Sequence, residues 1–248
     1  MIDIHAHILP GIDDGARDIY ETVEMAAQAA ANGTTAIVAT PHCNVPGSYE
    51  NYFGDAYVEV FENARNAIRR EGIPVELYPG MEVFATYDLP DLIINKKIMP
   101  LNQSRYILIE FAFDENPDFA LDVLKRVKEI GAKPVIAHAE RYDFIKDNPQ
   151  IAYEWRKMGC LIQANKSSFQ GKFGSGVQNT VFTLLDHNLI SVVASDAHRS
   201  SMRTTDMSEV YDFLRGRYSE KDIEILFRYN PERICQNQMT LMKKPVVF

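Results

Sequence analysis

Several features that define common classes of protein are scarce or missing in this sequence of 248 residues. It contains only three cysteines, Cys43, Cys160 and Cys235, which form neither an even set nor a C-x-x-C pair. A disulfide framework is therefore not expected, and a reducing compartment is the simple inference. No stretch approaches the roughly 18 consecutive apolar residues of a membrane span, and no signal peptide precedes the first patterned segment. We expect a cytoplasmic protein that does not insert into a membrane.

Basic residues are in the minority. The chain has 26 lysines and arginines against 34 aspartates and glutamates, which gives a formal net charge of -8 at pH 7. This balance argues against a general partner of nucleic acids or of anionic membranes, which would need a basic face. It does not exclude a phosphorylated substrate, because bound metal ions and a few arginines can create a local positive site.

Three catalytic signatures are also absent. No G-x-G-x-x-G motif follows the first strand-like segment, so the usual mark of a dinucleotide-binding sheet is missing. No G-x-S-x-G motif lies between a strand and a helix, so a serine hydrolase is unsupported. A cysteine-based phosphatase needs an arginine shortly after its nucleophile to cradle the phosphate. The corresponding positions after the three cysteines hold Tyr49, Lys166 and Leu241.

What the sequence does contain is an alternation of strand-like and helix-like segments. Strand-like segments lie near residues 2, 35, 75, 107, 134, 161 and 190. Helical patterns cover residues 18–32, 49–71, 89–97, 117–130, 149–158, 175–187, 208–217 and a segment from 219 onward. This alternation predicts an α/β fold with a parallel sheet and outer helices, either an open doubly wound sheet or a closed barrel. Because no linker or repeat divides the chain, we expect residues 1–248 to form a single domain.

Two histidines stand one residue apart near the N-terminus, in the segment Ile2-Asp3-Ile4-His5-Ala6-His7. In a strand, residues i and i+2 point to the same face, so His5 and His7 project together. Two imidazoles on one face suit a transition-metal ion. Alone the pair is weak evidence, because a surface pair on an edge strand has the same pattern. The case for a metal site therefore depends on the other histidines.

Several further polar residues each lie at or just past the C-terminal end of a different predicted strand. In a barrel, that face carries the active site. For one residue alone, such as Glu110 in an apolar strand, a partnered core carboxylate is the alternative interpretation. We assign no role to His187, which lies near the end of a helical segment. Together with His5 and His7, the candidate metal ligands are Asp14, His42, Glu82, Glu110, His138, Asp196 and His198.

Five histidines and four carboxylates are too many donors for one ion. The set suits two or three ions, with a carboxylate that bridges a pair. Mixed imidazole and carboxylate ligands favour Mn, Fe or Zn over Ca, and the lack of cysteine ligands argues against a structural zinc site. Such a centre would attract a phosphate and activate a water molecule as hydroxide. Arg141 and Arg203 follow ligands closely, and we interpret them as phosphate contacts. An ordinary surface salt bridge is the alternative for each.

The pattern resembles the PHP (polymerase and histidinol phosphatase) family over nearly the whole chain. The resemblance rests on His5-x-His7, Thr40-Pro41-His42, Gly80-x-Glu82, Glu110, the run from His138 to Tyr142, and Ser195-Asp196-Ala197-His198. The longer run from Asp3 to Ala16 is similar to the tyrosine-protein phosphatases of Gram-positive capsule and exopolysaccharide operons. This resemblance implies a distorted (β/α)7 TIM-like barrel and a site for three divalent ions, usually described with Mn2+. Fe, Zn or Mg are the alternative metals.

The resemblance also implies roles by position. It implies that one ion is held by His5, His7, Glu82 and Asp196, a second by Glu82, Glu110 and His138, and the third by Asp14, His42 and His198. It implies catalytic roles for Arg141, Arg203, His42 and His198. One departure is Ala139, where the family pattern has proline. This difference concerns the local loop and leaves the ligand in place.

The activity that the resemblance implies is hydrolysis of phosphotyrosine by a metal-bound hydroxide. The implied substrate is the tyrosine-rich tail of a bacterial tyrosine kinase that controls capsule or exopolysaccharide synthesis. A phenol, with a pKa of about 10, leaves without a strong general acid. The alternatives are a phosphatase for a small molecule such as histidinol phosphate, a phosphodiesterase or exonuclease of the same family, and a non-catalytic metal-binding regulator. The family also suggests a homo-oligomer, although the sequence identifies no interface.

Overall fold

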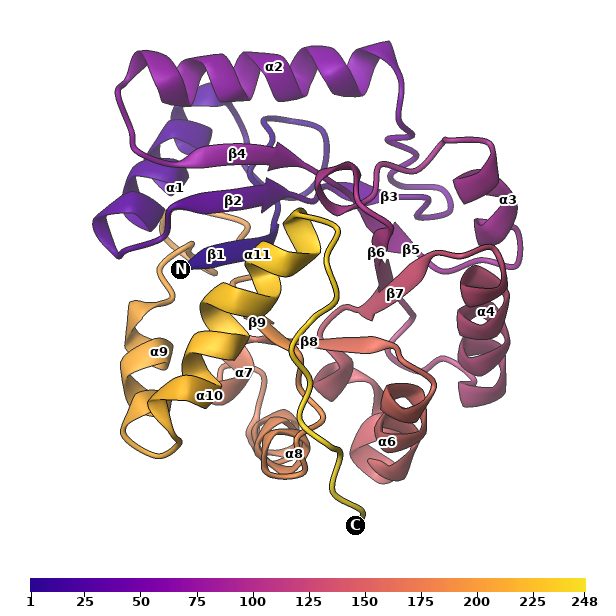
Figure 1. The fold of residues 1–248 in the computed structure, drawn as a ribbon. Coiled ribbons are helices and arrows are strands. Elements are labelled where there is room, and N and C mark those ends of the chain that lie inside the picture. Colours follow the sequence, from indigo (N-terminus) through magenta and orange to yellow (C-terminus); the bar gives the residue numbers. More distant parts are fainter.

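Nine parallel strands form two hydrogen-bonded sheets in the computed structural model, which describes residues 1–248 (Figure 1). The first sheet has the order β1-β2-β4, with bounds Ile2–Ala6, Ala36–Ala39 and Glu76–Pro79. The second has the order β3-β5-β6-β7-β8-β9, with bounds His42–Cys43, Glu82–Phe84, Tyr106–Glu110, Lys133–Ile136, Leu161–Asn165 and Val192–Ala194. The predicted α/β fold with a parallel sheet is confirmed.

The two sheets follow one another around a curled surface. β3 follows β2 and β5 follows β4 after short breaks, at residues 40–41 and 80–81. Pro41 cannot donate a ladder hydrogen bond, which explains the first break. Because β5 pairs with both β3 and β6, the second sheet continues where the first one stops. At the far edge, a bridge between Ala6 and Ala197 joins β1 to the segment after β9. The sequence predicted neither β3 nor β5 as a separate strand.

Helices cover the outside of the curled sheets, as the alternation predicted (Figure 1). Asp18 caps the first of them by accepting a hydrogen bond from the Glu21 amide at 2.9 Å, and Ser219 caps α10 in the same way. The bounds are α1 Ile19–Ala31, α2 Asp55–Arg70, α3 Leu89–Ile94, α4 Pro117–Glu129, α5 Asp143–Asp147, α6 Gln150–Lys157, α7 Lys166–Phe169, α8 Ser175–Asp186, α9 Ser208–Arg215, α10 Glu220–Glu224 and α11 Asn230–Cys235. Two 3-10 turns, η1 Leu101–Gln103 and η2 Ala139–Arg141, and a π-helical turn, η3 Ile225–Tyr229, complete the chain.

The strands separate two apolar clusters. Along β6, Ile107 and Ile109 pack in the larger cluster with side chains of the surrounding helices. Leu108, which points the other way, packs in a smaller inner cluster with side chains from β1, β2, β7, β8 and β9. Ile234 of α11 also belongs to this inner cluster, and α11 lies across this end of the sheets in Figure 1. The apolar inner cluster fills the space below the strand ends that carry the polar residues.

The prediction of a helix over residues 49–71 is wrong at its start. Helix α2 begins at Asp55, and residues 49–54 form a loop. Polar side chains tie this loop to its neighbours, because the Asn51 amide donates to the carbonyls of Ile12 and His42 at 2.7 and 2.9 Å. These contacts come from segments that are distant in sequence, so the local helical pattern could not reveal them.

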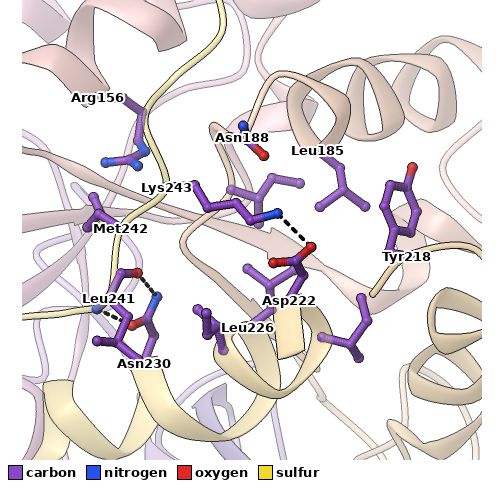
Figure 2. A pocket seen from close by; sticks show the side chains of 13 residues that line it. Arg156, Leu185, Asn188, Tyr218, Asp222, Leu226, Asn230, Leu241, Met242 and Lys243 are labelled. Atoms are coloured by element: carbon purple, nitrogen blue, oxygen red, sulfur yellow. Dashed lines mark hydrogen bonds and ion pairs between the residues drawn. The ribbon is translucent and has the colours of Figure 1, made fainter. Parts of the chain in front are cut away.

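The C-terminal tail crosses the outside of the fold, away from the polar strand ends. The Asn230 side chain exchanges two hydrogen bonds with the backbone of Leu241, at 2.7 and 3.0 Å, and Lys243 pairs with Asp222 (Figure 2). A cavity of about 50 Å³ lies beneath it, lined in part by Leu185 and Leu226. None of the predicted site residues lines this cavity. No helix in the fold has the length and apolar character that crossing a membrane would require.

We predict that Tyr57→Phe destabilises the fold at the break between β4 and β5. The buried Tyr57 hydroxyl donates to the Gly80 carbonyl at 2.9 Å and accepts from the Gly80 amide at 3.0 Å. Its loss leaves both groups buried without a partner, which costs about 1–3 kcal/mol in the free energy of unfolding. Urea unfolding would measure this change, with the exposed Tyr20→Phe as control. An unchanged midpoint for Tyr57→Phe would contradict the role of this contact.

Candidate metal centre

The histidine pair of β1 faces two carboxylates from other strands. The Nε2 atoms of His5 and His7 lie 3.2 Å apart, and both side chains are fully buried. Glu82 Oε2, at the start of β5, lies 3.2 and 3.1 Å from these two nitrogens. Asp196 Oδ1, just after β9, lies 3.5 and 3.6 Å from them. The structure thus brings together the four residues expected around a first ion.

A second group lies nearer to solvent. Asp14 Oδ1 is 3.6 Å from His42 Nε2 and 3.4 Å from His198 Nε2, and the Asp14 side chain is 48% exposed. His7 also contributes a ring nitrogen, so that one donor atom from each of the four residues lies within 4.8 Å of the others. This group contains the three residues expected around the third ion, with His7 shared between two groups.

The remaining candidates gather around Glu82 and Glu110. His138 Nε2 lies 3.0 Å from Glu82 Oε1 and 3.5 Å from Glu110 Oε1, as expected for a second ion. His42 Nδ1 lies 3.2 Å from Glu82 Oε2 and 3.5 Å from Glu110 Oε2. One donor atom from each of His42, Glu82 and Glu110 lies within 4.8 Å of the others, and His138 lies beside this triad. All nine predicted ligands therefore belong to one cluster in which Glu82 is central.

Hydrogen bonds from neighbouring residues fix the orientation of the imidazoles. Asp13 Oδ2 lies 2.7 Å from His7 Nδ1, and the same carboxylate accepts from the amides of His42 and Gly15. Gln163 Oε1 lies 2.9 Å from His5 Nδ1. These contacts hold the proton on Nδ1 and leave each Nε2 lone pair facing the cluster, which is the usual way that a protein orients a metal-binding histidine.

Strand β8 supplies support without supplying a ligand. The Gln163 amide donates to Asn165 Oδ1 at 2.7 Å, and Asn165 Nδ2 donates to Asp196 Oδ2 at 2.5 Å. A buried chain of hydrogen bonds thus runs from His5 to Asp196. Gln163 and Asn165 were not predicted from the sequence, although two amides at positions i and i+2 of a buried strand were a visible signal. Asp13 had no predicted function either.

Backbone conformation is special at three positions of the site. His138, Asp196 and Arg203 adopt left-handed φ angles of 32°, 50° and 53°, which are unusual for residues with a side chain. Gly15 meets a different constraint, because a Cβ atom there would lie 2.1 Å from the His7 carbonyl oxygen. Such strain persists where the surrounding structure enforces it, and it is concentrated at functional sites in many proteins.

The donor chemistry of the cluster suits divalent transition metals. Burial raises the pKa of Glu110 to about 9, and the neighbouring charge of Glu82 adds to this rise. Burial lowers the pKa of His138 to about 4, so its imidazole is neutral at pH 7 and able to bind a metal. The Nδ1 atoms of His42 and His138 are buried without a hydrogen-bond partner. Crowded carboxylates and buried imidazoles of this kind match the mixed O and N ligands of Mn, Fe or Zn.

Two arginines border the cluster at its open side. Arg203 Nη2 lies 2.6 Å from Asp196 Oδ2, and Arg141 Nη1 lies 3.6 Å from the same oxygen. Arg199 has a different environment, since it contacts the Gly15 carbonyl and pairs with the buried Glu21. His187 lies far from the cluster, at the end of α8, and its ring stacks on Phe248. The structure therefore brings both predicted phosphate contacts to the site.

We predict that Asp13→Asn weakens metal binding without removing a proposed ligand. The change removes the carboxylate charge that faces His7 Nδ1, and outer partners of this kind are worth about ten- to hundredfold in metal affinity. Titration of chelator-stripped protein with Mn2+ would measure the loss. The exposed Asp122→Asn on α4 is the matched control. Equal affinities for the two variants would contradict the supporting role of Asp13.

This chain is similar to known proteins over almost its full length. The family described as "Capsular polysaccharide synthesis, CpsB/CapC" matches residues 1–236. Tyrosine-protein phosphatase YwqE of Bacillus subtilis is 35% identical over 245 residues, which cover 99% of this chain and 95% of that protein. Tyrosine-protein phosphatase CpsB of Streptococcus pneumoniae is 32% identical over 244 residues, which cover 96% of this chain and 100% of that protein.

A solved structure is similar to the same extent. It comes from work described as crystal structures of YwqE from Bacillus subtilis and CpsB from Streptococcus pneumoniae, "unique metal-dependent tyrosine phosphatases". The match has a TM-score of 0.92 and 35% identity, and it covers 99% of this chain and 98% of that chain. With the family match, these likenesses show that the chain belongs to the CpsB/CapC family of capsular polysaccharide synthesis.

Proposed function

We propose that this chain is a metal-dependent protein-tyrosine phosphatase. The observation that carries the proposal is the single cluster of the nine predicted ligands with two arginines at its open side. Its relatives support the same reaction, because they are named as tyrosine-protein phosphatases at 35% and 32% identity. A non-catalytic regulator would have no need of the two arginines beside the cluster.

We propose manganese as the metal, in three positions. His5, His7, Glu82 and Asp196 would hold one ion, Glu82, Glu110 and His138 a second, and Asp14, His42 and His198 the third. When bound, the ions would supply positive charge for the phosphoryl oxygens and would lower the pKa of a water molecule. The crowding of buried imidazoles, among them the neutral His138, beside carboxylates supports this assignment. Glu82, which faces all three groups, would be the bridging carboxylate.

The residues of the chain itself account for the handling of the phosphate. Arg141 and Arg203 would bind phosphoryl oxygens, because a guanidinium matches them with two parallel donors. Both already lie beside Asp196 at the edge of the cluster. His42 and His198, on the solvent side with Asp14, would lie next to the substrate. The tyrosine leaving group requires little proton donation, since its pKa is about 10, and no additional acid is assigned.

The wider setting is proposed on the same basis. The curled sheets and the bridge between Ala6 and Ala197 support a distorted barrel with seven strand positions in a single domain. The family's place in capsular polysaccharide synthesis supports the tail of a bacterial tyrosine kinase as substrate. Three free, buried cysteines are consistent with work in the reducing cytoplasm. A homo-oligomer is the expected assembly from the family resemblance alone.

Metal reconstitution tests the proposed function. Chelator-stripped protein should gain activity on a phosphotyrosine peptide when Mn2+ is added, and it should have little activity on histidinol phosphate. Activity confined to histidinol phosphate would keep the metal centre but overturn the substrate. No activity with any divalent metal would overturn the proposal itself.

We predict that His42→Ala and His198→Ala each lower kcat/KM on the peptide by more than about a hundredfold, because even supporting residues of a metal site cost about ten- to hundredfold. His187→Ala is the matched control, since this histidine lies outside the cluster and stacks on Phe248. It should keep the activity of the unmutated protein. Full activity in either cluster variant would contradict the proposed site.

A further inference from the structure

The guanidinium of Arg141 contacts two aromatic rings. Its Cζ atom is 4.4 Å from the ring centroid of Phe113 and 4.3 Å from that of Phe173. Phe113 comes from the loop after β6, and Phe173 comes from the loop between α7 and α8. Both distances are well within the range of about 6 Å for a cation–π contact. Two loops that are distant in sequence therefore stack on one arginine at the end of η2.

Neither ring has an evident role in the core. Phe113 is 41% exposed, Phe173 is partly exposed, and neither belongs to the apolar clusters. The Phe113 ring also lies 6.0 Å from the ring of His138 and 6.3 Å from that of the buried Tyr142, centroid to centroid. The backbone of Phe113 is held in place, because its carbonyl accepts a hydrogen bond from the Asp143 amide at 2.8 Å. Arg141 is the contact that the two rings share, whereas Phe113 alone also lies beside His138 and Tyr142.

Stacking constrains where the arginine can donate hydrogen bonds. All five N–H groups of a guanidinium lie in its plane, and two rings in contact with it reduce the directions in which these groups can donate. One edge faces the metal cluster, where Arg141 Nη1 is 3.6 Å from Asp196 Oδ2. Arg203 is held by other means, namely its left-handed backbone and its 2.6 Å contact with Asp196. The two arginines thus depend on different supports.

We propose that Phe113 and Phe173 are positioning residues that hold the edge of the Arg141 guanidinium toward the phosphoryl group of the substrate. This inference rests on the proposed phosphatase function and extends it to two residues outside the metal cluster. Without the rings, the long arginine side chain would sample several rotamers and bind phosphate less often in the productive orientation.

Leucine substitutions test the proposal because they keep an apolar side chain but remove the ring face. Phe113→Leu and Phe173→Leu should each lower kcat/KM on a phosphotyrosine peptide by about threefold to thirtyfold, the scale of a cation–π contact. Competitive inhibition by inorganic phosphate should weaken by a similar factor. Manganese content and thermal stability should not change. Phe113→Tyr, which keeps the ring, should restore most of the activity.

Phe213→Leu is the matched control. Phe213 is also 41% exposed, and its ring stacks on Arg217 at 4.3 Å, but this pair lies on α9 and beyond it, outside the site. Its substitution should leave kcat/KM and phosphate inhibition unchanged. A loss in this control equal to that of Phe113→Leu would show that the effect is not specific to Arg141, and would overturn the proposal.

A double-mutant cycle separates positioning from direct substrate contact. In an Arg141→Ala background, Phe113→Leu and Phe173→Leu should have no further effect on kcat/KM or on phosphate inhibition. If they still lower both, the rings act without the arginine and the proposal is wrong. It is equally wrong if the unmutated protein is active and the leucine variants match it. If the unmutated protein has no phosphatase activity, the proposed function fails. Calorimetric binding of inorganic phosphate to the manganese-loaded protein and its variants then still tests whether Phe113 and Phe173 position Arg141, because each leucine variant should bind phosphate more weakly.

Discussion

One buried carboxylate and the four imidazoles around it set the central constraint on this structure. Glu82 Oε2 lies 3.2, 3.1 and 3.2 Å from ring nitrogens of His5, His7 and His42, and Oε1 lies 3.0 Å from His138. An ionised carboxylate buried without compensation is very costly, so it needs positive charge, which the proposed metal ions would supply between it and the imidazole nitrogens. Because its partners come from different strands, the sheet must curl to bring the strand ends together. The catalytic proposal depends on this convergence.

The surrounding strands and side chains hold the residues around Glu82 in place. Parallel strands place their C-terminal ends on one side, and the inner apolar cluster fills the space beneath them. Asp13 and Gln163 then fix the imidazoles of β1, while Asn165 holds Asp196. Left-handed backbone at some of the strand ends turns their side chains inward at a conformational cost. These conformations lower the stability of the folded chain, but they help to hold the donor atoms of the cluster in fixed positions, which a metal-dependent reaction requires.

The sequence predicted the site better than it predicted the supports of the site. The two-residue period of a strand was sufficient to pair His5 with His7, and the strand ends identified the other residues that the fold gathers around them. The break that makes Glu82 the start of a separate strand depends on contacts from α2, which no local pattern contains. Gln163 could have been noticed as a polar residue in a buried strand, but its partner His5 is far away in the sequence. Phe113 meets Arg141 only through loops placed by the fold.

The manganese content of the Glu82→Gln variant tests the central claim most directly. After chelation, reconstitution and gel filtration, plasma mass spectrometry should find about three ions per chain in the unmutated protein, as the family resemblance implies for a donor set of this size. The variant keeps the size of the side chain but loses its charge and one bridging oxygen. We expect it to retain only the ion at Asp14, His42 and His198, because these residues gather without Glu82. A full complement of manganese in the variant would contradict the account.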